Sequence, residues 1–255
     1  MKALLYFCWI GMVLSAGVAC SGEEPPRFYG NTYNGPLSPN EEKMVNHAII
    51  SYSKAVNKES KLNENSRFAS DTRCNSKFGI IPYYHLANNL CSLPNSTHLH
   101  IGLYTGGSFV SALYNNQHLL KEKIGIDWFE DEGYKRVFYA VCDKYLRSND
   151  DENVYFIIER DCFSVDVSNF TNPIDIYIYD AGHSFSAHEQ AFTYYNQAFA
   201  DVFIAVVDDW EWAEVRQATF NAFDKLRYTI LYQNEIRCHK KTGNGQYIAV
   251  IKKSF

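Results

Sequence analysis

From residue 98 onward, short apolar stretches alternate with longer amphipathic stretches. The short stretches predict strands at 98–103, 123–128, 153–159, 174–180, 202–208, 227–233 and 246–253. The longer stretches predict helices at 107–120, 132–147, 184–199 and 211–225. Strands that alternate with helices indicate a parallel sheet with helices on both faces.

The last two predicted strands are joined differently from the others. Their connection is polar, contains Gly243 and Gly245, and has no room for a crossover helix. Strands joined in this way pair antiparallel. We therefore expect an α/β, Rossmann-like domain with a seven-stranded, mostly parallel sheet that ends in a C-terminal antiparallel hairpin.

The N-terminal third of the chain has no such alternation. Residues 23–40 are rich in Gly, Pro and Asn and are typical of a linker, and a helix is expected from Ser38 to about Lys54. A second helix is expected around 82–92. We divide the chain into a linker with a helical extension at 23–80 and the α/β domain at 81–255.

Residues 1–22 form a separate unit. Lys2 is followed by a stretch without charge from Ala3 to Gly22, which ends in small residues and is typical of a signal for the secretory route. A membrane anchor is the alternative, and this segment is the only expected link to a membrane. If it is instead an apolar helix, the protein is cytoplasmic.

Composition narrows the class of partner. The chain has 255 residues, 46% hydrophobic content and a net charge of −5, with Lys and Arg scattered along it. This charge distribution argues against nucleic acid and favours a small molecule. Cysteine spacing does not fit a metal site, and Cys74 with Cys91 is a candidate disulfide only if the protein is exported. The sequence does not indicate an oligomeric state.

A glycine-rich turn follows the first strand of the domain. Gly102, Gly106 and Gly107 have the spacing G-x-x-x-G-G, and Asp127 ends the next strand 20 residues after Gly107. Glycines allow a close approach of backbone to ligand, and an acid at this place can bind both hydroxyls of a ribose. The spacing differs from the dinucleotide pattern G-x-G-x-x-G, so a nucleoside other than a dinucleotide is favoured.

Acidic residues follow several other strands at the edge where ligands bind in open α/β sheets. Asp180, Asp208 and Asp209 end consecutive strands, and three such carboxylates could converge on Mg²⁺ or Ca²⁺. His183 lies three residues after Asp180 and could accept a proton there. The alternative is that these acids cap the following helices. Outside this group, His98 is expected at a strand edge and His188 in solvent.

The segments IGLYTGGS, GIDWF, IYDAGHS, VVDDW and YIAVIKK occur in this order between residues 80 and 255. They resemble class I S-adenosylmethionine-dependent methyltransferases, within which the macrocin- and cephalosporin-type O-methyltransferases are the most similar group. The resemblance implies an enzyme that methylates a hydroxyl of a small molecule or glycan, with S-adenosyl-L-methionine and Mg²⁺ as cofactors.

The resemblance also implies roles for individual residues. His183 would be the general base, and the metal ligands would be Asp180, Asp208 and Asp209. The residues around the cofactor would be Gly102, Tyr104, Thr105, Gly106, Gly107, Ser108, Asp127, Asp161, Cys162 and Asp180. Where the family usually has an acid before the glycine turn, this chain has His100.

Two other functions compete with this one. An exported domain that kept the fold without catalysis could bind a glycan or a protein, and His100 favours that alternative. A nicotinamide-dependent oxidoreductase is disfavoured by the glycine spacing and by the terminal hairpin.

Overall fold

A computed structural model describes residues 33–64, 82–146, 155–237 and 245–254. Residues 1–22 and Cys74 lie outside these ranges, so the predictions made for them are not addressed by the structure. In the described parts of the chain, no helix is long and apolar enough to cross a membrane.

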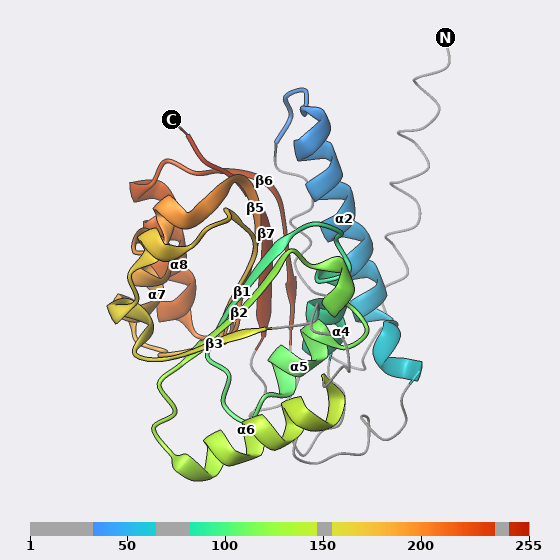
Figure 1. Cartoon of the computed structure of the whole chain (residues 1–255). Helices are drawn as coiled ribbons and strands as arrows, with labels where there is room; N and C mark the ends of the chain where they lie inside the picture. The colour runs from blue at the N-terminus through green and yellow to red at the C-terminus, as the bar shows by residue number, and fades with distance from the viewer. Residues whose placement is uncertain (1–32, 65–81, 147–154, 238–244, 255) are drawn as a thin grey trace, which may run out of the picture.

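The centre of the molecule is a seven-stranded sheet (Figure 1). Its strands are β1 (Thr97–Ile101), β2 (Glu122–Asp127), β3 (Phe156–Glu159), β4 (Ile174–Tyr179), β5 (Phe199–Val207), β6 (Thr229–Ile236) and β7 (Gln246–Lys252). The spatial order is β3-β2-β1-β4-β5-β7-β6, in which β1 to β5 are parallel. Strand β7 lies between β5 and β6 and is antiparallel to both, which confirms the predicted fold.

Helices cover both faces of the sheet. One face carries α2 (Pro39–Val56), α4 (Pro82–Leu90), α5 (Gly107–Leu113) and α6 (Glu132–Tyr145), and the other carries α7 (Phe185–Thr193) and α8 (Ala213–Lys225). The two faces have separate cores because successive side chains of a strand point to opposite sides. Thus Ile176 and Ile178 belong to the first core, while Tyr177 and Tyr179 belong to the second.

Two helices are shorter than predicted. The predicted helix 107–120 ends at Leu113 because Asn115 adopts a left-handed backbone (φ 55°), which an α-helix cannot include. A short 3₁₀ helix, Gln117–Leu119, follows it. The predicted helix 184–199 likewise ends at Thr193 and continues as the 3₁₀ helix Asn196–Ala198.

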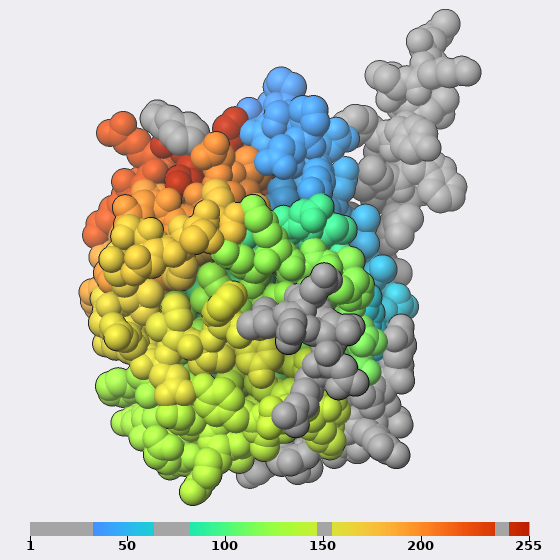
Figure 2. Space-filling model, in the orientation of Figure 1, coloured from blue at the N-terminus to red at the C-terminus, as the bar shows by residue number. Residues whose placement is uncertain are grey.

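Helix α2 is built into the domain. Ser38 caps its N-terminus in a capping box with Glu41, and its buried residues include Ala48 and Ala55. The helix packs against α4 and against β5, β6 and β7. Its blue surface is continuous with the body of the molecule (Figure 2). The core therefore includes a segment that we assigned to an extension.

Candidate functional site

A large cleft opens at the carboxyl ends of β1, β2 and β4, with a volume of about 1420 Å³. The strand order reverses between β1 and β4, and such a switch point is where open α/β sheets bind ligands. All the predicted site residues line this cleft except Gly106, which precedes α5, and Asp209, which reaches it through His183.

The glycine turn has the geometry that its sequence predicts. Gly102 has φ 85° and Gly106 has φ 94°, a region that other residues adopt at a cost. A Cβ atom on Gly102 would overlap the carbonyl oxygen of Asp180, so the ends of β1 and β4 meet here without space for a side chain. Ser108, in the first turn of α5, hydrogen-bonds His100 at 3.1 Å.

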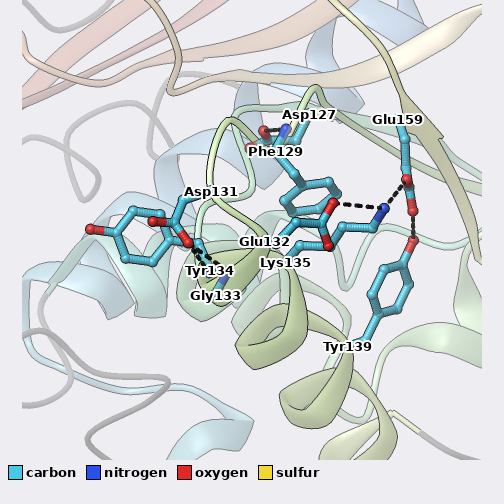
Figure 3. A network of polar contacts seen from close by, with 9 residues as sticks. All are labelled: Asp127, Phe129, Asp131, Glu132, Gly133, Tyr134, Lys135, Tyr139 and Glu159. Atoms are coloured by element: carbon cyan, nitrogen blue, oxygen red, sulfur yellow. Dashed lines mark hydrogen bonds and ion pairs between the residues drawn. The ribbon is translucent and has the colours of Figure 1, made fainter.

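Asp127 connects two loops at the rim. Its Oδ2 accepts hydrogen bonds from the backbone N–H groups of Leu103 (2.7 Å) and Tyr104 (3.0 Å). Its Oδ1 accepts one from the N–H of Phe129 at 2.7 Å (Figure 3). A carboxylate offers about four lone-pair positions, so capacity remains for a ligand hydroxyl.

Both loops that Asp127 holds are strained. Tyr104 and Phe129 have φ values of 46° and 47°, and non-glycine residues in this region are concentrated at ligand clamps and active sites. The Tyr104 ring packs against Tyr134 of α6 at 4.4 Å between centroids. Trp128, 63% exposed, lines the same side of the cleft.

The loop after β3 contributes Asp161 and Cys162. Asp161 accepts a hydrogen bond from the N–H of Phe163 (2.8 Å), so it caps the turn that carries Cys162. Burial raises the pKa of the Cys162 thiol to about 11, which keeps it protonated and unreactive. The loop is placed by the end of β3, where Glu159 accepts hydrogen bonds from Lys135 and Tyr139 of α6 (Figure 3).

Asp180 and Asp208 form a polar chain that lines the cleft, in which Asp180 is partly exposed and Asp208 is buried. Their carboxyl groups are close enough for each to shift the pKa of the other. Tyr83 donates to Asp180 Oδ2 at 3.1 Å, and Gln246 donates to Asp208 Oδ1 at 2.7 Å. Burial, followed by the charge of Asp208, raises the pKa of Asp180 well above its usual range, and burial with the Asp209 charge raises the pKa of Asp208 to about 6. These shifts favour a proton shared between the two carboxylates.

Asp209 has a different partner from its neighbour. Its carboxylate forms an ion pair with Nδ1 of His183, and this contact raises the pKa of that imidazole. Its backbone has φ 56°, which is a left-handed conformation. Within the described residues, no group of three or more His, Cys, Asp or Glu side chains is arranged to hold a metal ion. The geometry therefore does not support the predicted Mg²⁺ site of Asp180, Asp208 and Asp209.

Several side chains in the cleft were not predicted from the sequence, and three of them show why. Tyr83 comes from α4, outside the strand ends, and Arg160 and Trp128 follow β3 and β2. The sequence could have predicted Trp128 as a cleft residue, because it directly follows Asp127. Tyr83 could not be predicted in this way, since only the packing of α4 on α5 brings it to Asp180.

No family model matches the sequence, and no curated protein matches it. Assignment to the macrocin- and cephalosporin-type group therefore stays a prediction. Solved structures do resemble the chain. TrmN from Thermus thermophilus superposes with a TM-score of 0.53 at 11% identity over 74% of this chain, which spans only 52% of TrmN.

Two other similar structures have lower scores. The O-methyltransferase from Bacillus cereus in complex with SAH has a TM-score of 0.46 and 12% identity, covering 86% of this chain and 92% of its own. The rRNA methylase from Streptococcus thermophilus has a TM-score of 0.47 and 11% identity, covering 67% of this chain and 96% of its own. At such identities, the likeness to TrmN shows that the fold is shared.

Proposed function

We propose that this protein is an S-adenosylmethionine-dependent O-methyltransferase that acts on a hydroxyl of a small molecule or glycan. The observation that carries the proposal is the convergence of the glycine turn, Asp127 and the His183–Asp209 pair on one cleft. The net charge of −5 supports a small acceptor over nucleic acid.

The cofactor would lie along the carboxyl ends of β1 and β2. Gly102 leaves room for a close approach of backbone, and the remaining lone pair of Asp127 can accept from ribose hydroxyls. All four of Gly107, Ser108, Asp161 and Cys162 line the cleft, and in this proposal the first two would border the methionine part of the cofactor and the last two the adenine. When bound, S-adenosylmethionine supplies a methyl group on a positively charged sulfur.

The protein's part in the reaction is to align the acceptor and remove its proton. His183 is half-exposed, lines the cleft, and has one ring nitrogen engaged by Asp209. Its other nitrogen is available to accept the hydroxyl proton.

Calorimetric titration of the full chain with S-adenosylhomocysteine tests the proposal. We expect the wild-type protein to bind this ligand and Asp127→Ala not to bind it. The variant loses the hydrogen bonds that hold the two rim loops and also the proposed contact with the ribose. Asp166→Ala is the matched control because that exposed acid caps a turn away from the cleft. Absence of heat at millimolar ligand would reject the function.

A second candidate is an exported, non-catalytic domain that binds a glycan or a protein. Two observations favour it: Asp127 already accepts three backbone hydrogen bonds, and His100 is fully buried where the similar family has an acid. The pattern of residues 1–22 supports the secretory route on which this alternative depends. Failure of S-adenosylhomocysteine to bind the folded protein would favour it.

A further inference from the structure

Asp209 is held in a strained position directly behind the cleft. A non-glycine residue in the left-handed region costs roughly 1–2 kcal/mol, and such strain persists where the surroundings impose it. The N–H of Trp212 donates to the backbone oxygen of Asp209 at 3.0 Å, which secures the turn. The Asp209 side chain is 3% exposed, so its orientation is fixed by packing.

The Asp209 carboxylate forms an ion pair with the His183 imidazole, and its charge also acts on Asp180, Asp208 and His188. The imidazole is 49% exposed on the cleft side, and its ring lies 5.4 Å from that of Trp212. Because Asp209 engages Nδ1, the ring presents Nε2 away from the carboxylate. A neutral imidazole with a proton on Nδ1 has its acceptor lone pair on Nε2.

The side chain of the neighbouring Asp208 has a different partner from Asp209. Asp208 accepts a hydrogen bond from Gln246, whereas Asp209 pairs with His183, so the two adjacent carboxylates have different direct partners. A shared cation would need both, together with Asp180, around one point. The left-handed turn at Asp209 sends successive side chains to different partners instead.

We propose that Asp209 is a positioning residue that keeps His183 in the Nδ1–H tautomer with Nε2 toward the cleft, in place of the divalent cation expected from the acids. The inference rests on the proposed function and deepens it. In that reaction, Nε2 takes the proton of the acceptor hydroxyl, whose oxygen bonds to the methyl carbon as the carbon–sulfur bond of the cofactor breaks.

Nitrogen-15 NMR of the imidazoles in the full-length protein tests this assignment without cofactor or acceptor. We expect the neutral ring of His183 to carry its proton on Nδ1, and its signals to be unchanged by added Mg²⁺. Asp209→Asn keeps the size of the side chain, and its amide can donate to Nδ1, so the tautomer should shift toward Nε2–H.

Asp208→Asn is the matched control, because it removes the adjacent charge, which acts on the His183 pKa at a distance, and leaves the Asp209–His183 ion pair in place. We expect it to leave the tautomer unchanged. A thermal melt confirms that each variant is folded, and an Nε2–H tautomer in the wild-type spectrum would overturn the proposal even if one variant fails to fold. A shift of the His183 signals by Mg²⁺, or the same tautomer in wild type and Asp209→Asn, would overturn the proposal.

The NMR and calorimetric measurements test the positioning role of Asp209 and the proposed methyltransferase function separately. If His183 has the expected tautomer but S-adenosylhomocysteine does not bind, the pair stands and the methyltransferase proposal fails. If the ligand binds and the tautomer is indifferent to Asp209, the proposed function stands and the positioning role is rejected.

Discussion

At the scale of single residues, backbone conformation decides what the rim of the cleft can do. Asp209 reaches His183 because its backbone is left-handed, and Asp127 joins two loops through its hydrogen bonds. Gly102 has no side chain, which allows its backbone to lie directly against the carbonyl oxygen of Asp180 at the end of β4. Small local changes here should therefore have large effects.

Gly102→Ala is expected to destabilise the fold by about 2–4 kcal/mol, since overpacking and a positive φ both oppose it. Gly182→Ala, in the same cleft, is the matched control because its added Cβ would lie 3.4 Å from the nearest atom. We expect that variant within about 1 kcal/mol of wild type. Urea unfolding of both measures the difference, and equal losses would contradict this account.

At the scale of elements, β1 combines a central position with unusual composition. It lies between β2 and β4, and His98 and His100 are both fully buried there against Phe109 of α5. The expectation that His98 lies at a strand edge is wrong, because β2 and β4, which come later in the chain, pair with β1 on its two sides. His188 is also buried, against Tyr179, and not in solvent.

Burial lowers the pKa of His98 to about 3, compared with an ordinary value near 6.5. Because the folded-state pKa is the lower one, the stabilisation is fully present above pH 6.5 and is lost as the pH falls toward 3. From pH 7 to pH 5 the cost from His98 alone is about 2 kcal/mol.

His98→Leu should remove that part of the pH dependence, whereas His118→Gln, an exposed histidine, should retain it. Urea midpoints at pH 7 and pH 5 for the three proteins provide the measurement. If His98→Leu keeps the wild-type slope, His98 is not the group that titrates.

At the scale of the whole molecule, an N-terminal helix completes a core made by the C-terminal strands. Ala48 of α2 is fully buried, and Lys252 of β7 forms an ion pair with Glu41 at 2.7 Å. The same helix meets α4, which places Tyr83 in the cleft. Segments at opposite ends of the sequence thus stabilise each other and the site.

Ala48→Glu is expected to destabilise the protein by more than about 3 kcal/mol, because it places an unpaired charge in the core. Ile50→Glu, on the exposed side of the same helix, should change stability by less than about 0.5 kcal/mol. Thermal unfolding of both variants tests whether α2 belongs to the cooperative unit. Similar melting for both would mean that it does not.

The sequence by itself determined the strands and helices, the terminal hairpin, the glycine turn and the acids of the rim. These features depend on periodicity and on backbone preferences over a few residues. Only the tertiary structure decided that β7 inserts between β5 and β6, that α2 joins the core and that His98 is buried. It also directs Asp208 and Asp209 to different partners, because side-chain direction and burial depend on contacts between segments that are distant in the chain.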